Sequence, residues 1–212
     1  MTEHNFELMR RAMVTGQLRT NAVNDPRVVA AMASVPREAF VDGTAAAISY
    51  TDRTLALGGG RFLAAPMITG RLLTEARVQP TDRALVIGAG PGYAAAVLAL
   101  LAAQVTALDE VGVVAGPLLS PNATRVEGPL AEGWAAGATY DLILIDGAVE
   151  EVPDTIAAQL ADGGRLATGL LRDGVTRLAI GRKAGGHLGL STFADAEVPV
   201  LPGFATPQGF RF

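Results

Sequence analysis

Three glycines at alternate positions have the spacing in this sequence that points most directly to chemistry. Gly88, Gly90 and Gly92 stand between an apolar run, "RALVI", and an alanine-rich run, "YAAAVLALLAA". Glycines at a strand-to-helix turn permit positive φ and let a ligand approach the backbone, and the helix start beyond them offers free N–H groups. Such a turn either holds part of a nucleotide or nucleoside, or simply packs a helix tightly on a strand.

A pair of carboxylates, Asp109 and Glu110, follows the turn. In α/β nucleotide-binding proteins an acid about 20 residues after the turn accepts hydrogen bonds from the ribose hydroxyls. The dinucleotide pattern G-x-G-x-x-G requires a glycine where this chain has Tyr93, whereas G-x-G-x-G is the form associated with S-adenosylmethionine. Turn and acids together favour a nucleoside cofactor. A solvated pair at a strand end is the alternative interpretation of the acids.

The composition excludes several kinds of site. The 212 residues contain no cysteine, which removes disulfides, thiolate nucleophiles and cysteine-bound metals. The two histidines, His4 and His187, stand in no metal-binding or Ser-His-Asp pattern, so we predict no metal site. A net charge of −4 provides no broad basic surface, so we predict no nucleic-acid partner.

One uncharged stretch, Ala84–Leu108, is long enough to be considered as a membrane span. Three glycines, Pro91 and Gln104 interrupt it, and both of its ends resemble strands. A strand–turn–helix–strand unit of a soluble domain explains it better, so we predict no membrane association. The start of the chain is charged and lacks a hydrophobic signal core, which predicts a cytoplasmic location.

The elements that must position the glycines and acids alternate between strand and helix from Thr81 onward. This alternation predicts an α/β fold with an open, mostly parallel sheet whose two faces are covered by helices. The predicted strands are 83–88, 104–110, 124–128, 140–147 and 165–171, with helices at 92–103 and 152–164 and a terminal hairpin of strands at 177–183 and 190–201.

The first 80 residues have a helical pattern instead. Apolar residues recur at helical spacing from Phe6 to Leu18. A second helix is predicted between an N-cap at Asn24 or Asp25 and a stop at Pro36. A looser segment at 37–66 and a third helix at 67–78 follow.

Three long stretches resemble the protein-L-isoaspartate O-methyltransferase family in order and spacing. They are "MVTGQLRTNAVNDPRVVAAMASVPREAFVD", "AISYTDRTLALGGGRFLAAPMITGRLL" and "ALVIGAGPGYAAAVLALLAAQVTALDE". The block "DPRVVAAMASVPREAFV" is the most specific, because generic methyltransferases lack it. The stretches "YDLILIDGAVEEVPDTIAAQLADGGRL" and "EVPVLPGF" extend the likeness, which covers about residues 9–204.

The resemblance implies a seven-stranded, doubly wound methyltransferase (Rossmann-like) sheet with added N-terminal helices. It divides a single compact domain into an N-terminal helical and substrate-loop region, 1–80, packed on an S-adenosylmethionine-binding core, 81–212. It also implies transfer of a methyl group from S-adenosylmethionine to the carboxylate of isoaspartyl residues, so isoaspartyl proteins or peptides are the partners. That carboxylate is already ionised at neutral pH, so the reaction needs alignment more than a general base.

The resemblance assigns the site residue by residue. The family's active-site serine falls at Ala64, where the hydroxyl is absent, within an acceptor loop of Phe62, Leu63 and Ala64. The implied cofactor site comprises Gly88, Ala89, Gly90, Gly92, Tyr93, Asp109, Glu110, Gly128, Pro129 and Asp146. Asp146 either compensates for acids that the chain lacks or caps the end of a strand.

Several positions depart from the family pattern. Besides Ala64, Val86 replaces a carboxylate before the first glycine, and Pro129 replaces an aspartate near the adenine. The segment 110–125 is short, and 167–169 reads Ala-Thr-Gly instead of Pro-Val-Gly. Losing one hydrogen bond to a charged group costs about 1–3 kcal/mol and slows a reaction about 10- to 100-fold. Two alternatives stay open: a methyltransferase-fold binding protein without catalysis, and a methyltransferase for another carboxylate acceptor.

Overall fold

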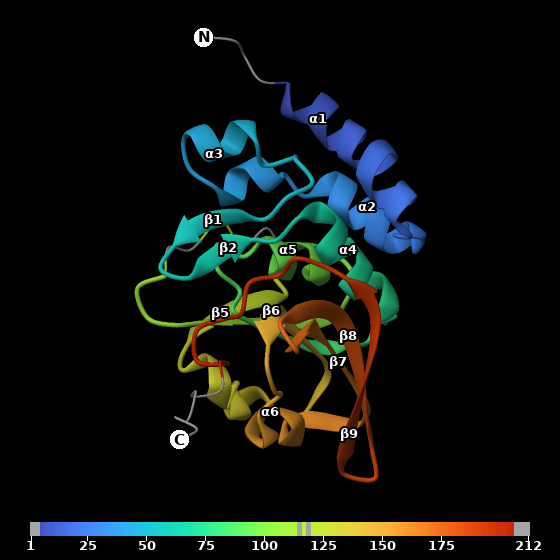
Figure 1. Cartoon of the computed structure of the whole chain (residues 1–212), viewed down its shortest axis with the longest axis vertical. Helices are drawn as coiled ribbons and strands as arrows, with labels where there is room; N and C mark the ends of the chain where they lie inside the picture. Colours follow the sequence, from blue (N-terminus) through green and yellow to red (C-terminus); the bar gives the residue numbers. More distant parts are fainter. Residues whose placement is uncertain (1–4, 114–115, 118–119, 206–212) are drawn as a thin grey trace.

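A seven-stranded sheet runs through the centre of the computed structural model, which describes residues 5–113, 116–117 and 120–205 (Figure 1). The strand order is β5-β4-β3-β6-β7-β8-β9. Neighbours from β5 to β7 are parallel, and β8 and β9 add two antiparallel strands. The bounds are β3 Arg83–Ile87, β4 Gln104–Asp109, β5 Ala123–Glu127, β6 Tyr140–Val149, β7 Leu160–Arg172, β8 Val175–Ala184 and β9 His187–Asp195.

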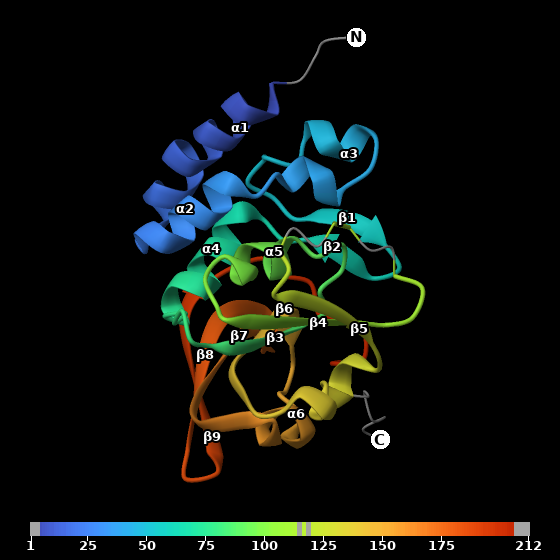
Figure 2. The same cartoon turned by 180° about the vertical axis from the view of Figure 1, so that it is seen from behind.

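Helices cover both faces of this sheet, as the unbroken apolar runs predict. Helices α4 (Pro66–Glu75) and α5 (Tyr93–Ala99) lie on one face and α6 (Asp154–Ala158) on the other (Figures 1 and 2). In the middle of the sheet, Leu85 of β3 pairs with Ile143 of β6, and both are fully buried. The prediction of a mostly parallel, doubly wound α/β sheet is confirmed. Between β4 and β5 the described residues contain no helix, as the short 110–125 segment suggests.

The predicted helix at 152–164 is wrong over its second half. Helix α6 ends at Ala158, and β7 already begins at Leu160. The pairing of β6 with β7 jumps from Tyr140↔Leu160 to Leu142↔Arg165. The glycines that we interpreted as a helix stop therefore form a bulge inside a strand, where Gly163 takes a φ of +77°.

The predicted last strand at 190–201 is also wrong at its end. β9 stops at Asp195, and among the described residues beyond it only Val200 makes an isolated parallel bridge, to Ala148. Pro199 has no N–H to donate to a strand ladder, so a regular strand could not have continued to residue 201. Residues 196–205, here called the C-terminal segment, instead run beside the end of β6.

The N-terminal helices are confirmed. Helix α1 (Phe6–Met13) continues into a π-helical turn (Val14–Leu18) and a 3-10 turn (Arg19–Asn21). Met13 and Leu18 are both fully buried, because the i→i+5 bonding of a π turn aligns residues five apart. In α2 (Pro26–Ser34) the N-cap is Asp25, whose carboxylate accepts from the Arg27 N–H at 2.8 Å.

The segment that we expected to be loose contains an unpredicted hairpin. Short helical turns, η3 (Arg37–Phe40) and α3 (Thr44–Ala47), lead to strands β1 (Leu55–Gly58) and β2 (Arg61–Leu63). The hairpin turn consists of glycines at positive φ. The hairpin adjoins the glycine turn after β3, since the Phe62 carbonyl oxygen lies 3.8 Å from where a Cβ on Gly90 would stand.

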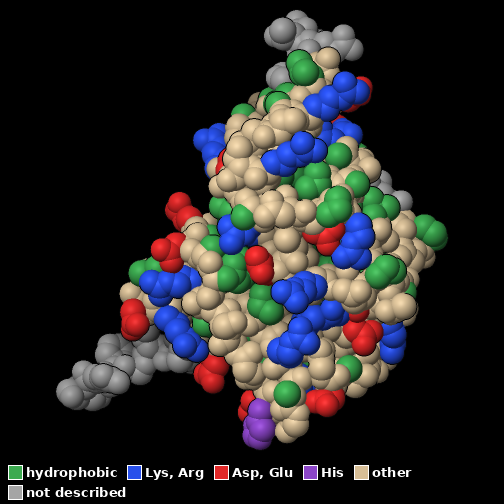
Figure 3. All heavy atoms as spheres, turned by 90° about the vertical axis from the view of Figure 1, so that its right-hand side faces the viewer, with side chains coloured by type: hydrophobic (Ala, Val, Ile, Leu, Met, Phe, Trp, Pro, Cys, Tyr) green, Lys and Arg blue, Asp and Glu red, His purple; other side chains and the backbone are tan. Residues whose placement is uncertain are grey.

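The surface carries charges of both signs. On the face shown in Figure 3, basic and acidic side chains are interspersed rather than gathered into one stripe. His187 lies at the start of β9, far along the sheet from the glycine turn, and His4 lies outside the described residues. No helix in the described part of the chain is long and apolar enough to cross a membrane.

Candidate functional site

The glycine turn joins β3 to α5 at the carboxyl edge of the parallel strands. The N–H groups of Gly88 and Ala89 donate to the Leu108 carbonyl at 3.0 and 3.1 Å, which ties the turn to the end of β4. Gly88, Gly90 and Gly92 have φ values of +73°, +52° and +105°. Side chains rarely adopt this backbone, so the glycine spacing has a conformational cause.

Asp109 lies directly against this turn. Its Oδ2 accepts a hydrogen bond from the Gly90 N–H at 2.5 Å, and its backbone carbonyl accepts one from the Gly128 N–H at 3.0 Å. The side chain of Asp109 is only 3% exposed, whereas that of Glu110 is 49% exposed. Fold and register thus bring together the turn, the two acids and the Gly128-Pro129 pair, as the assignment requires.

Arg61 holds both acids, which sequence reasoning did not anticipate. From β2 its Nε and Nη2 donate to Asp109 Oδ1 at 2.8 and 2.6 Å, and Nη2 also donates to Glu110 Oε2 at 2.8 Å. Burial by itself lowers the pKa of Arg61, but the hydrogen bonds and charges of the two acids outweigh burial and raise that pKa. Arg61 is therefore a cation, and its Nη1 is buried without a hydrogen-bond partner among the described residues.

Asp146 is a third acid at the carboxyl edge, beside Asp109 and Glu110. It lies in β6, half-buried, and its carboxylate accepts no hydrogen bond from the described residues. Burial is the main cause that raises the pKa of Asp146 to about 7; within that value the charge of Arg37 acts to lower the pKa and the charge of Asp109 acts to raise it. A carboxylate in this state is suited to a cationic group of a ligand.

Arg37 is a second cation that we did not assign. It is fully buried, and its Nε and Nη2 donate to the carbonyls of Ser49 and Ala64 at 2.8 and 2.7 Å. Its guanidinium lies 4.5 Å from the centre of the Tyr93 ring, and that ring also packs edge-on against Phe40. The side chain of Tyr93 is therefore part of the core, so only its backbone remains at the start of α5 for a ligand.

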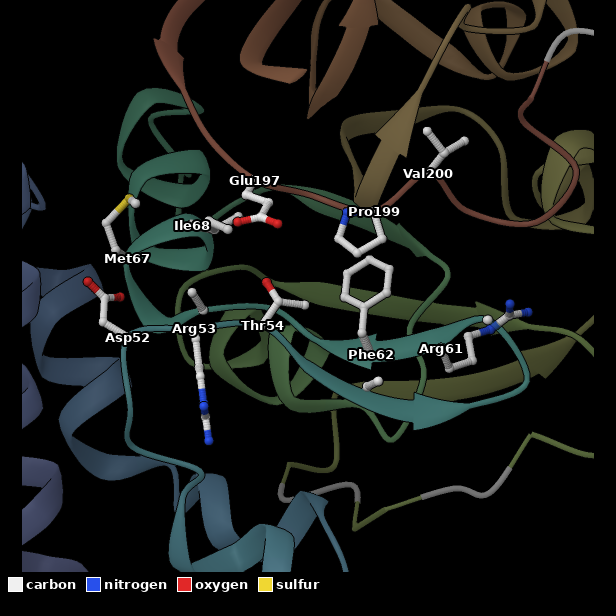
Figure 4. Close-up of a pocket in the computed structure, with 13 residues that line it drawn as sticks. Asp52, Arg53, Thr54, Arg61, Phe62, Met67, Ile68, Glu197, Pro199 and Val200 are labelled. Atoms are coloured by element: carbon white, nitrogen blue, oxygen red, sulfur yellow. The ribbon is translucent and has the colours of Figure 1, made fainter. Parts of the chain in front are cut away.

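The acceptor loop borders a cavity of about 530 Å³ (Figure 4). Phe62 lines it from β2, Thr54 from just before β1, Ile68 from α4 and Glu197 from the C-terminal segment. Leu63 and Ala64 are buried, at 3% and 2% exposure, and do not line this cavity.

Val86 and Gly88 both lie in tightly packed surroundings. Val86 is fully buried within β3, between Ala107 and Leu144, so it lies inside the sheet rather than at its edge. Leu201 of the C-terminal segment covers the turn, since its Cδ1 lies 2.6 Å from where a Cβ on Gly88 would stand. Arg37 and Arg61 stand inside the quoted resemblance, but no sequence signal paired them with Ala64 or Asp109.

Comparison with known proteins gives a consistent result. The family model described as protein-L-isoaspartate(D-aspartate) O-methyltransferase matches residues 9–189. A protein-L-isoaspartate O-methyltransferase of Koribacter versatilis (strain Ellin345) is 35% identical over 204 residues, which is 92% of each chain. A protein-L-isoaspartate O-methyltransferase 1 of Rhodopseudomonas palustris (strain HaA2) is 36% identical, over 76% of this chain and 69% of its own.

Solved structures support the fold. A protein-L-isoaspartate O-methyltransferase aligns with a TM-score of 0.79 at 21% identity, over 92% of this chain and 66% of its own. A putative enzyme of the same name from Plasmodium falciparum, in complex with S-adenosyl-L-homocysteine, aligns with a TM-score of 0.77 at 19% identity, over 94% and 99%. These neighbours have the same arrangement of sheet and helices.

Proposed function

Because the chain belongs to the protein-L-isoaspartate(D-aspartate) O-methyltransferase family, we propose that it methylates the free carboxylate of isoaspartyl residues in damaged proteins. The observation that carries the proposal is the match along residues 9–189, which includes the acceptor loop, the glycine turn and both site acids. S-adenosylmethionine is the methyl donor in this proposal. A cytoplasmic location remains a prediction.

The acids at the carboxyl edge fit such a donor. A ribose diol offers two hydrogen-bond donors that Asp109 or Glu110 can accept. The carboxylate of Asp146, which accepts no hydrogen bond from the described residues, suits a cationic amino or sulfonium group. When bound, S-adenosylmethionine supplies a methyl group on positively charged sulfur. The residues proposed to hold it are Gly88, Ala89, Gly90, Gly92, the Tyr93 backbone, Asp109, Glu110, Gly128, Pro129 and Asp146.

The acceptor is assigned to the cavity beside Phe62. Its carboxylate is ionised at neutral pH, so the protein has to bind and align it rather than remove a proton. Phe62, Leu63 and Ala64 form the loop next to it, and the hydrogen bond from Arg37 fixes the backbone of that loop at Ala64. Ala64 offers no hydroxyl, so we expect a slower reaction than a serine would allow.

The first test uses radiolabelled S-adenosylmethionine and a pair of peptides that differ only in an isoaspartyl or an aspartyl residue. We expect label in the isoaspartyl peptide alone. Binding of S-adenosylmethionine without label in either peptide would favour a binding protein with a degenerate site, which the absent hydroxyl at Ala64 makes the second candidate. Label in small carboxylic acids but not in the peptides would indicate a different acceptor.

A further inference from the structure

Arg61 donates hydrogen bonds to Asp109 and Glu110, the two acids that the proposed function assigns to binding the ribose hydroxyls. Its side chain is 5% exposed and spans from the hairpin to the end of β4. Arg61 lines the acceptor cavity and also a second cavity, of about 660 Å³, that includes Pro91 of the glycine turn. The guanidinium therefore stands where the proposed acceptor and cofactor regions meet.

One oxygen of the Asp109 carboxylate, Oδ1, has no acceptor capacity left in this arrangement. Oδ1 accepts from Arg61 Nε, from Arg61 Nη2 and from the Glu110 N–H at 2.7 Å, and Oδ2 accepts from the Gly90 N–H. Each carboxylate oxygen offers about two lone-pair sites, so the three donors at Oδ1 exceed its sites and Oδ2 keeps one site. A ribose diol that binds Asp109 with one hydroxyl on each oxygen must therefore replace a donor at Oδ1.

Arg61 is the donor that can leave. The N–H groups of Gly90 and Glu110 are fixed by the backbone of the turn and of β4, whereas Arg61 reaches Asp109 through a long side chain from a three-residue strand, β2. Its second partner, Glu110, is half exposed, so an intermediate position at the surface is available to the guanidinium.

We propose that Arg61 competes with the nucleoside for Asp109, so that cofactor binding releases Arg61 and with it the hairpin that carries the acceptor loop. The proposal rests on the proposed function. It makes Arg61 a residue that sets cofactor affinity and couples the cofactor region to the acceptor cavity, because Phe62 follows it directly in β2.

The main experiment is calorimetric titration of S-adenosylhomocysteine into the wild-type protein and Arg61→Gln. Without Arg61 the buried Asp109 loses its cation, so the free protein becomes less stable and the ligand has no competitor to displace. We expect about tenfold tighter binding in Arg61→Gln, which corresponds to about 1.4 kcal/mol. The melting temperature of the free variant should be lower and its rise on adding ligand larger.

Two nucleosides test whether the ribose is responsible. Adenosine carries the diol, and 2′,3′-dideoxyadenosine lacks it. The gain in affinity on Arg61→Gln should appear with adenosine and be absent with the dideoxy compound. An equal gain with both would contradict competition at Asp109.

The matched control is Arg165→Gln. Arg165 pairs with Asp82 at 2.7 Å, with side chains 11% and 5% exposed, at the opposite edge of the sheet. This variant loses a buried ion pair as well, but its affinity for S-adenosylhomocysteine should stay at the wild-type value. If Arg61→Gln does not fold, Arg61→Lys keeps the positive charge but loses the forked pair of donors to Asp109, and a smaller gain in affinity is expected.

Hydrogen exchange tests the connection to the hairpin. The amides of residues 55–63 should exchange faster in free Arg61→Gln than in the free wild-type protein, and unchanged exchange would overturn the coupling. Equal or weaker S-adenosylhomocysteine binding in Arg61→Gln would overturn the competition while leaving the proposed function in place. Binding by neither protein would overturn both.

Discussion

Two carboxylates of the site, Asp109 and Asp146, lie in opposite electrostatic environments. Asp109 accepts hydrogen bonds from Arg61 and from backbone N–H groups, whereas Asp146 accepts none from the described residues. Burial therefore raises the pKa of Asp146 to about 7. Asp146 is the acid whose charge changes in the neutral range, and it faces Arg37 from η3 and Asp109 from β4.

We predict that Asp146→Asn stabilises the free protein above pH 7. From the ordinary value of 3.8 to about 7, the unfolded chain loses the Asp146 proton before the folded chain does, so the wild-type protein loses stability as pH rises through this range. Asparagine does not ionise, so the variant keeps this stability. At pH 8 its free energy of unfolding should exceed that of the wild-type protein by at most about 4 kcal/mol, at 1.36 kcal/mol per pKa unit. Urea unfolding at pH 4.5 and pH 8 measures it; equal gains at both pH values would contradict the raised pKa.

The same variant should lose the pH dependence of ligand binding. A cationic ligand prefers ionised Asp146, so S-adenosylmethionine should bind the wild-type protein more tightly as pH rises through 7. Asp146→Asn should bind it more weakly at pH 8 and almost equally at pH 6. Calorimetry at the two pH values distinguishes this role from that of a strand cap, which would leave the affinity unchanged.

We predict that Ala64→Ser increases the methylation rate. Ala64 does not line the cavity, so the gain requires the acceptor carboxylate to reach past Phe62 to residue 64. A hydroxyl there adds one hydrogen bond to a charged group, about 1–3 kcal/mol, which is about 10- to 100-fold in rate. The matched control is Ala31→Ser, which adds a hydroxyl at a similarly buried position in α2 that lines neither cavity and should leave the rate unchanged. Similar rate gains in both variants would show that Ala64 is not the relevant position.

At the scale of elements, the carboxyl edge of the sheet is enclosed by two segments that belong to neither the sheet nor its helices. The β1–β2 hairpin reaches Asp109 through Arg61, and the C-terminal segment covers Gly88 through Leu201. The backbone of that segment is tied to Ala148 of β6 by hydrogen bonds of 2.8 and 3.0 Å, from Ala148 N–H and from Leu201 N–H. Access to the glycine turn therefore depends on both segments.

We predict that Gly88→Ala abolishes S-adenosylhomocysteine binding and destabilises the protein by about 1–3 kcal/mol, through a positive φ and overpacking. The new Cβ would stand 2.6 Å from Leu201 Cδ1. Gly174→Ala is the control: its φ of +76° matches the +73° of Gly88, but nothing lies within 4 Å of its Cβ. Gly174→Ala should lose only the stability that a side chain at positive φ costs, and it should bind S-adenosylhomocysteine as tightly as the wild-type protein. Equal losses of stability in Gly88→Ala and Gly174→Ala would mean that the Leu201 side chain moves aside without an energetic cost.

At the scale of the molecule, residues of the N-terminal region and of the sheet share one hydrophobic core. Met32 of α2, Leu72 of α4 and Leu98 of α5 belong to the same buried cluster. Arg37 adds a polar connection, because it binds carbonyls at Ser49 and Ala64 and stacks on Tyr93. The division at residue 80 therefore remains a prediction about function, whereas packing joins the two parts.

We predict that Arg37→Met lowers the free energy of unfolding of the whole protein by about 2–4 kcal/mol, because two buried carbonyls lose charged donors. Unfolding should remain a single transition in the wild-type protein and the variant. Circular dichroism and Trp134 fluorescence, recorded during the same urea titration, check this. Arg11→Met, which removes an exposed pair with Glu7, should change stability by less than about 0.5 kcal/mol. Two separate transitions would mean that residues 1–80 fold independently.

The sequence by itself determined the features that depend on neighbours in the chain. Apolar runs predicted the central strands, Asp25 was one of two predicted helix caps, and the glycine spacing predicted a strand-to-helix turn that permits positive φ. Each of these follows from conformational preferences within a few residues. The glycines of β7 misled us for the same reason, because a local pattern does not distinguish a helix stop from a bulge.

Only the tertiary structure decided what surrounds the site acids. Arg61 reaches Asp109 across 48 residues and Arg37 reaches Ala64 across 27, and Leu201 covers Gly88 from the far end of the chain. A sequence shows that a cation exists but not which carboxylate it meets, because that depends on how the hairpin and the C-terminal segment pack on the sheet. The acids were therefore predictable, whereas their occupation by Arg61 was not.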